Sequence, residues 1–257
     1  MLDNDLYDRV ADTWWKDGAF LNFLKAGVNP ARFGYMRGKL VDELKMEPRS
    51  LQVLDVGCGG GLLAEEFARL GCHVTGVDPS AGSLKAARAH AEAGGLDINY
   101  QQGTGEALPV PDASFDMAYC CDVLEHVHSV DATLRGIARS LKPGGVFFYD
   151  TINRTRRSRM LFIKISQDWK ATAWADPGLH DWDHFIRPGE LDQSMLQAGL
   201  QPKERTGFAP KSAPAALLAF RARAKGRIDY AEMGFRLNLQ TSRDISGSYG
   251  GWATKHA

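Results

Sequence analysis

The 257-residue sequence lacks a net charge, because 31 lysines and arginines balance 31 aspartates and glutamates. This balance gives no reason to expect nucleic acid as a partner. Apolar runs of roughly 20 residues, the length that spans a bilayer, are also missing. The N-terminus carries Asp3, Asp5 and Asp8 where a signal peptide needs a basic start and an apolar run. We therefore predict a cytoplasmic protein.

The sequence also lacks C-x-x-C spacing, the usual mark of a zinc site. Its four cysteines are Cys58, Cys72, Cys120 and Cys121. Cys120 and Cys121 lie within an apolar run, where a thiol behaves as a small hydrophobic side chain. We expect neither a zinc site of this kind nor a disulfide framework.

Short strand-type runs alternate with helical segments between residues 51 and 150. Strand-type runs lie at 51–54, 73–77, 98–101, 115–121 and 146–150, and helical segments at 62–70, 81–93 and 130–141. This alternation predicts an α/β fold with a parallel sheet and helices on both faces. Right-handed crossovers place the carboxyl ends of the strands at one edge, where ligands bind.

The two flanking segments have a different pattern, and we interpret the chain as one domain in three parts. Residues 1–45 predict a helical cap, interrupted at Asn29-Pro30, and residues 46–152 form the cofactor-binding core. Residues 153–257 make a lid or substrate region with C-terminal strands. In that region the sequence indicates a helix at 190–198, antiparallel strands at 200–208 and 249–254, and an inserted helix at 214–225.

A glycine-rich turn follows the first strand, in the stretch V-L-D-V-G-C-G-G-G-L-L at residues 53–63. Gly57, Gly59 and Gly61 have no Cβ, so the backbone can approach a ligand closely and adopt a positive φ. The helix that follows offers free N–H groups at its start. This pattern alone also fits a nucleotide-dependent dehydrogenase, in which the pyrophosphate sits on the helix start.

Two carboxylates favour S-adenosylmethionine over a dinucleotide. Asp55 lies inside the motif, where it would repel a pyrophosphate but suits the cationic amino group of a methionine moiety. Asp78 ends the second strand, where a carboxylate can accept both ribose hydroxyls. The loop of Thr104, Gly105 and Glu106 follows the third strand and is placed to lie along the adenine.

These stretches, with G-V-D at 76–78 and L-K-P-G-G at 141–145, resemble the class I S-adenosylmethionine methyltransferases. The resemblance implies a Rossmann-like sheet of seven strands, the last of them antiparallel. It also implies that Gly57, Gly59, Asp78 and the loop at 104–106 contact the cofactor. We add Pro79, directly after Asp78, to the predicted contacts.

A narrower resemblance is to the ubiquinone-biosynthesis O-methyltransferases, which methylate polyprenyl-catechol intermediates. It rests on four stretches: R-V-A-D-T-W-W-K-D-G (9–18), N-P-A-R-F-G-Y-M (29–36), C-D-V-L-E-H-V (121–127), and T-I-N-R (151–154) with H-D-W-D-H-F-I-R-P-G-E-L (180–191). It implies a phenolic or quinol acceptor and a cofactor contact from Arg32. The match fades after about residue 208, where an insertion reaches to about residue 243.

The C-D-V-L-E-H-V stretch ends the fourth strand over the cofactor edge, and Cys121 is expected to line the methionine side. If a helix starts here, Asp122, Glu125 and His126 share one face. His126 is then a candidate general base for a phenol proton. Alternatively all three residues hold a divalent cation that lowers the pKa of a catechol. The family resemblance favours the metal, with Mg²⁺ suggested. A third interpretation is purely structural. Asp122 and Glu125 then stabilise the start of a helix through its dipole, and His126 is a hydrogen-bonded side chain of the core.

Two further features leave alternatives open. His180, in the polar cluster 180–184, is a candidate for facing the acceptor, or else part of a loop that closes as a lid. The segment 154–174 is basic and apolar together, which is typical of a helix at a membrane interface or of a lid helix with solvated arginines. For the whole chain, a methyltransferase acting on another nucleophile and a non-catalytic S-adenosylmethionine-binding protein remain alternatives.

Overall fold

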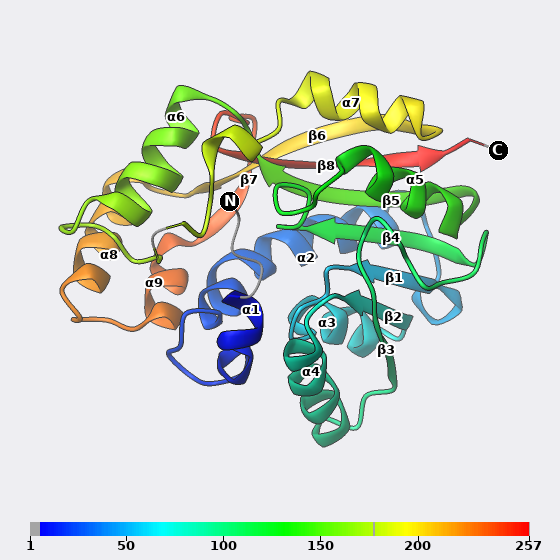
Figure 1. The fold of residues 1–257 in the computed structure, drawn as a ribbon, viewed down its shortest axis with the longest axis horizontal. Helices are drawn as coiled ribbons and strands as arrows, with labels where there is room; N and C mark the ends of the chain where they lie inside the picture. Colours follow the sequence, from blue (N-terminus) through cyan, green and yellow to red (C-terminus); the bar gives the residue numbers. More distant parts are fainter. Residues whose placement is uncertain (1–5, 177, 257) are drawn as a thin grey trace.

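The computed structural model describes residues 6–176 and 178–256, so Asp3 and Asp5 of the N-terminal prediction lie outside the described residues. Its centre is one mixed sheet with the strand order β3-β2-β1-β4-β5-β8-β6-β7 (Figure 1). The strands are β1 (Gln52–Val56), β2 (His73–Asp78), β3 (Ile98–Gln102), β4 (Phe115–Cys121), β5 (Leu141–Ile152), β6 (Leu200–Pro210), β7 (Leu239–Ser242) and β8 (Ser248–Lys255).

The first five strands are parallel, as the alternation predicts. Strand β8 runs antiparallel between β5 and β6, which confirms the antiparallel C-terminal edge. The described residues form eight strands where seven were predicted. The additional strand, β7, is four residues long and pairs only with the end of β6, from Gly207 to Pro210. Its sequence L-Q-T-S has too little alternation to indicate a strand.

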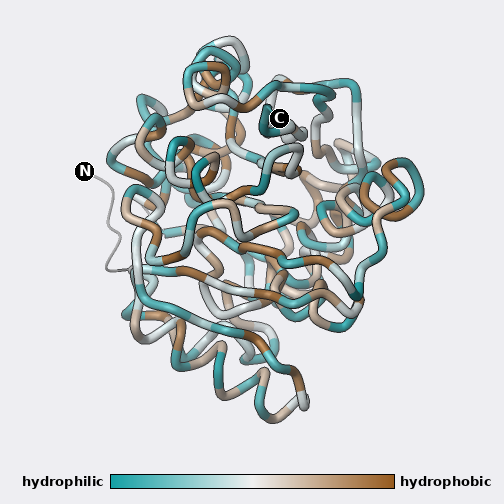
Figure 2. The backbone as a smooth tube through the Cα atoms, turned by 90° about the vertical axis from the view of Figure 1, so that its right-hand side faces the viewer, coloured by the Kyte–Doolittle hydropathy of each residue, from teal (hydrophilic) through white to brown (hydrophobic). Residues whose placement is uncertain are grey.

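Helices cover both faces of the sheet because residues along each strand alternate in direction. Helices α5 (Val130–Ser140) and α7 (Pro188–Gln197) pack on one face, against side chains that include Leu54 and Phe147. Helices α3 (Leu62–Leu70) and α4 (Ala81–Ala93) pack on the other face, against Val53 and Phe148. Figure 2 shows hydrophobic segments along the strands of this interior.

The N-terminal cap is helical, but its pieces differ from the prediction. They are α1 (Leu6–Arg9), η1 (Ala11–Thr13), η2 (Leu24–Val28), α2 (Asn29–Arg37), η3 (Gly38–Glu43) and, after the cap, η4 (Pro48–Ser50). The expected interruption at Asn29-Pro30 is wrong, because helical turns continue from Leu24 to Glu43. Pro30 is the second residue of α2, and the turn before it is a π-helix in which the Asn29 N–H bonds the Leu24 carbonyl.

The insertion forms two helices that pack on the cap rather than on the sheet. They are α8 (Ala213–Ala224), as predicted, and α9 (Tyr230–Leu237). Gly27 of η2 faces Gly234 of α9 so closely that a Cβ on Gly27 would lie 2.7 Å from the Gly234 Cα. Trp174 stacks on Phe220 of α8, with ring centroids 5.9 Å apart. The cap, the segment around Trp174 and the insertion therefore share one apolar cluster.

The remaining elements are α6 (Arg156–Ser158), η5 (Arg159–Asp168) and η6 (Trp182–His184). Helix α6 continues directly into η5, so the basic segment is helical from Arg156 to Asp168. Among the residues that the structure describes, no helix is long and apolar enough to cross a membrane.

Candidate active site

The glycine turn between β1 and α3 has the conformation that its sequence predicts. Gly57, Gly59 and Gly61 all have positive φ, at 76°, 52° and 82°. A Cβ on Gly57 would lie 2.2 Å from a methyl group of Val123, and one on Gly59 would lie 2.5 Å from the indole of Trp14. The turn thus has glycine for two reasons, its backbone angles and the close approach of neighbouring side chains.

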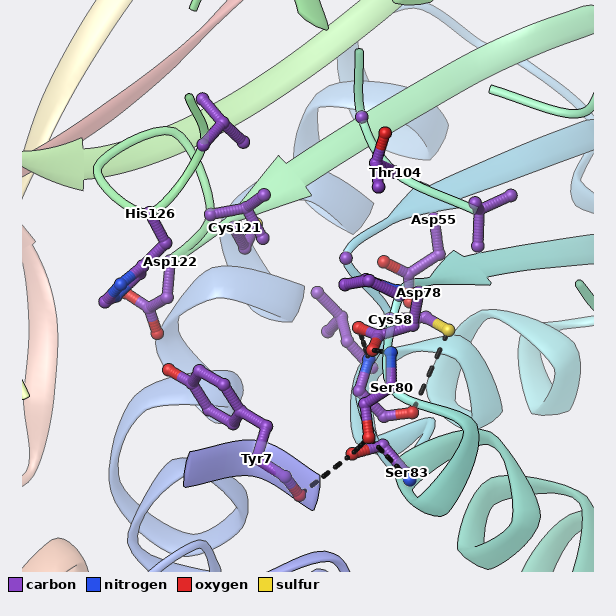
Figure 3. Close-up of a pocket in the computed structure, with 18 of the residues that line it drawn as sticks. Tyr7, Asp55, Cys58, Asp78, Ser80, Ser83, Thr104, Cys121, Asp122 and His126 are labelled. Carbon is purple, nitrogen blue, oxygen red and sulfur yellow. Dashed lines mark hydrogen bonds between the residues drawn. The ribbon is translucent and has the colours of Figure 1, made fainter. Parts of the chain in front are cut away.

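A cavity of about 370 Å³ opens at the carboxyl ends of β1, β2 and β4, beside this turn (Figure 3). Twelve of the predicted site residues line it: Arg32, Asp55, Gly57, Gly59, Asp78, Pro79, Thr104, Gly105, Glu106, Cys121, Asp122 and His126. Glu125 and His180 are not among the lining residues. The structure therefore brings residues from five separate stretches of the chain around one cavity.

Asp78 holds the glycine turn in place. Its carboxylate accepts hydrogen bonds from the Gly59 N–H at 2.8 Å and the Ser80 N–H at 2.9 Å. Burial raises its pKa from 3.8 to about 6, although these two backbone bonds favour the ionised form. A carboxylate oxygen has a second lone pair, so both oxygens can still accept from a ligand hydroxyl. The role in shaping the turn was not predicted from the sequence.

Asp55 is buried at the end of β1 and accepts a hydrogen bond from the Tyr119 hydroxyl at 2.8 Å. Burial raises the pKa of Asp55 to about 8, and the Tyr119 bond opposes this rise. A cationic group in the cavity would favour the ionised carboxylate.

Arg32 lies between two carboxylates on the carboxyl ends of β4 and β5. Its Nη2 is 2.5 Å from Asp122 Oδ1 and 3.0 Å from Asp150 Oδ1. Arg32 is buried, with only 5% of the residue exposed. Burial opposes its charge, but the two carboxylates raise its pKa above the ordinary value. In turn, Arg32 lowers the pKa of Asp122 against the effect of burial.

The predicted metal site at Asp122, Glu125 and His126 is not assembled. The expected helix does not start here: Asp122 has a φ of 53°, and α5 begins only at Val130. Glu125 is buried, accepts a hydrogen bond from Thr151 Oγ1 at 2.8 Å, and has a pKa that burial raises to about 8. Among the described residues, no group of three or more His, Cys, Asp or Glu could hold a metal ion. The residues present do not fit Mg²⁺.

The two predicted histidines are neighbours, with ring centroids 5.7 Å apart. His126 lines the cavity, and burial lowers its pKa from 6.5 to about 4, although Asp122 opposes the shift. His180 packs edge-on against Phe162 and Phe185, and Gln167 bonds its backbone N–H at 2.8 Å. Burial lowers the pKa of His180 to about 3. Both rings are therefore neutral near pH 7, and His126 is the one that faces the cavity.

The N-terminal cap supplies lining residues that the sequence analysis missed, Tyr7, Asp8 and Trp14 among them. Trp14 Nε1 donates to Ser83 Oγ at 2.9 Å, and Trp15 Nε1 donates to the Gly60 carbonyl at 2.8 Å. For the segment that carries these aromatics, the sequence predicted a helical cap. Nothing in their spacing identified the glycine turn as the surface that they cover.

Comparison with known proteins agrees with this fold. A family model described as a methyltransferase domain matches residues 54–149. A putative sarcosine dimethylglycine methyltransferase from Galdieria sulphuraria has a similar structure, with a TM-score of 0.61 and 19% identity, over 98% of this chain and 99% of that one. An S-adenosylmethionine-dependent methyltransferase from Aquifex aeolicus gives 0.59 and 12% identity, over 99% of both chains. These structures share the Rossmann-like fold of the chain, and the matched domain together with the curated relatives described next makes the chain an S-adenosylmethionine-dependent methyltransferase.

Similarity to curated relatives identifies the family within this class. The ubiquinone biosynthesis O-methyltransferase of Methylobacterium nodulans is 37% identical over 207 residues, which cover 78% of this chain and 82% of the relative. The protein of the same name from Methylocella silvestris is 39% identical over 213 residues, with the same shares covered. The chain belongs to the family of the ubiquinone biosynthesis O-methyltransferases.

Proposed function

We propose that this enzyme methylates a phenolic oxygen of a catechol-type small molecule, of the ubiquinone-precursor kind that the names of its relatives indicate. The observation that carries the proposal is the position of His126. A neutral imidazole on the cavity wall is able to accept the proton of a phenol. Bound S-adenosylmethionine supplies the methyl group for an in-line displacement.

In the proposed arrangement the chain orients the donor along the cavity. Asp78 accepts the ribose hydroxyls, and the loop of Thr104, Gly105 and Glu106 follows the adenine. Arg32 and Asp55 lie on the methionine side, beside Cys121. Their lining positions support these assignments. Positioning of the two reactants supplies much of the rate of such a displacement.

The direct test is an acceptor screen with purified protein and S-adenosylmethionine. We expect release of S-adenosylhomocysteine with prenyl-substituted catechols, and the same rate with and without EDTA, because the residues around His126 do not form a metal site. Donor binding without turnover on any acceptor would contradict the proposal. Turnover that EDTA abolishes would contradict the proposal that His126 acts as the base without a metal ion.

A methyltransferase for another small nucleophile is the second candidate. The insertion favours it. Helices α8 and α9 pack on the cap, and they lie in the part of the chain where the resemblance to the O-methyltransferases fades. Turnover with thiols, amines or carboxylates, and none with catechols, would identify this alternative in the same screen.

Asp78→Asn is expected to weaken donor binding about 100-fold, because the neutral amide has a single acceptor oxygen and cannot accept hydrogen bonds from both ribose hydroxyls as the carboxylate does. Binding should also weaken as pH falls below about 6, because the carboxylate that accepts these bonds becomes protonated there. Isothermal titration calorimetry with S-adenosylmethionine measures both effects.

The matched control for this prediction is Asp116→Asn. Asp116 also accepts a backbone N–H, that of Gln52 at 2.9 Å, but it lies at the opposite end of its strand. This variant should bind the donor normally. Normal binding by Asp78→Asn would show that the ribose is placed wrongly.

We also propose a cytoplasmic enzyme that touches the membrane surface through residues 154–174, where a polyprenylated acceptor would be dissolved. Met160 and Trp169 on this segment are 44% and 49% exposed. Its unpaired charge is smaller than its composition indicates, because Arg154, Arg157 and Lys164 form ion pairs with acidic side chains. An exposed tryptophan beside cations is typical of an interfacial segment.

This contact predicts co-sedimentation with anionic vesicles of phosphatidylglycerol at low salt. Trp169→Ala should reduce the bound fraction several-fold, because the apolar anchor is lost. Leu196→Ala removes an equally exposed side chain, 50% exposed on α7, and should leave binding unchanged. Failure of the unmodified protein to sediment with these vesicles would refute the contact.

A further inference from the structure

Tyr7 of α1 lines the cavity from the cap, on the side opposite the end of β4. In Figure 3 its hydroxyl points across the cavity toward Asp122 and His126. The rings of Tyr7 and His126 meet edge to face, with centroids 6.2 Å apart and an interplanar angle of 88°. A phenol group and an imidazole therefore face the same space from two different elements.

Several contacts hold the Tyr7 ring in this orientation. It stacks on Trp14 at 6.4 Å between centroids, and Trp14 is bonded to Ser83 at the start of α4. The neighbouring Asp8 accepts a hydrogen bond from Ser80 Oγ at 2.5 Å and another from the Gly82 N–H at 3.2 Å. The ring is thus fixed to the same helix end that borders the cofactor side of the cavity.

The Tyr7 hydroxyl keeps its proton in this environment. Burial, and then the carboxylates of Asp122 and Glu125, raise its pKa above the ordinary value. A protonated phenol is able to donate one hydrogen bond and accept others. Across the same space, His126 is neutral near pH 7 and can accept a proton.

We propose that Tyr7 is a specificity-determining residue, whose hydroxyl donates a hydrogen bond to the second oxygen of a catechol while the reacting oxygen faces His126. This inference rests on the proposed function. A catechol carries two neighbouring oxygens, which match the neighbouring phenol of Tyr7 and imidazole of His126 at one end of the cavity. A site built to bond a substrate hydroxyl discriminates against the analogue that lacks it, because a polar group is then left without a partner.

The test compares Tyr7→Phe with the unmodified protein on a prenyl-substituted catechol and on the monophenol that lacks the second hydroxyl. The unmodified enzyme should prefer the catechol in kcat/KM. In the variant we expect the ratio of kcat/KM for the catechol to kcat/KM for the monophenol to fall about 10-fold, through a higher KM for the catechol. The monophenol should react at an unchanged rate, and calorimetry should give unchanged S-adenosylmethionine affinity.

Tyr230→Phe is the matched control, because it removes a hydroxyl that bonds the Trp174 carbonyl at 2.8 Å outside the cavity. It should keep the full preference. An equal loss on both acceptors in Tyr7→Phe, or an unchanged preference, overturns the role of Tyr7 while catechol methylation stands. Absence of catechol turnover in the unmodified protein overturns the proposed acceptor, and the role of Tyr7 with it.

Discussion

Replacement of His126 by glutamine is expected to lower kcat about 100- to 10,000-fold, the usual contribution of a positioned general base. Glutamine has a similar reach and polarity but accepts no proton near neutral pH. The donor affinity should change little, because the predicted donor contacts lie on other elements. Steady-state kinetics at saturating donor, with calorimetry of S-adenosylmethionine binding, measure the two quantities separately.

The pH profile gives this prediction a second, independent readout. A general base must be unprotonated, and burial lowers the pKa of His126 to about 4. We therefore expect kcat to be insensitive to pH around 6.5, the ordinary value for histidine, and to fall only toward about 4. A loss of kcat centred near 6.5 would show that the reacting state does not keep His126 buried.

His73→Gln serves as the matched control, since His73 begins β2 at the opposite edge of the sheet and is exposed. Its kcat should equal that of the unmodified enzyme. A kcat for His126→Gln within a few-fold of the unmodified value would refute the assignment and leave positioning as the main source of rate.

Replacement of Arg32 by leucine is expected to lower the free energy of unfolding by about 3–5 kcal/mol, measured by denaturant titration without the donor. The reason is the pair of carboxylates that the guanidinium contacts, Asp122 and Asp150, the second of which is only 2% exposed. Removing one partner of a buried ion pair leaves an uncompensated charge, which costs more than the pair itself contributes.

The destabilisation should depend on pH and on the second carboxylate. In the unmodified protein, burial raises the pKa of Asp150 to about 6, against the opposing effect of Arg32. Without Arg32 this pKa should be higher still, so the loss caused by Arg32→Leu should shrink as pH falls toward 6, below which Asp150 is protonated in both proteins. Combining Arg32→Leu with Asp150→Asn should restore part of the stability at pH 7 for the same reason.

Arg37→Leu provides the control on the same helix. Arg37 pairs with Asp42 at 3.3 Å on the surface, and both side chains are largely exposed. Such pairs contribute within about 1 kcal/mol. Equal effects of the two substitutions would contradict a special role for the buried network around Arg32.

Local sequence determined the parallel core and the glycine turn. Strand runs and helix-type segments alternate at short range, and each is specified by a periodicity within about ten residues. The positive φ of Gly57, Gly59 and Gly61 is likewise a local requirement, and the glycines in the sequence predict it. The placement of Asp55 and Asp78 at strand ends follows from the same strands, because parallel strands share one ligand-binding edge.

The tertiary structure alone decided how the cavity is closed and which groups face it. Asp122, Glu125 and His126 were expected on one helical face, but the left-handed φ of Asp122 turns the chain before α5 begins, and Glu125 bonds Thr151 instead. Spacing along a chain reports a shared face only where the backbone is regular. Likewise Arg32 meets Asp150 across 118 residues of sequence, and Tyr7 meets His126 across the cavity, because such contacts arise from packing and leave no periodic signal in either segment.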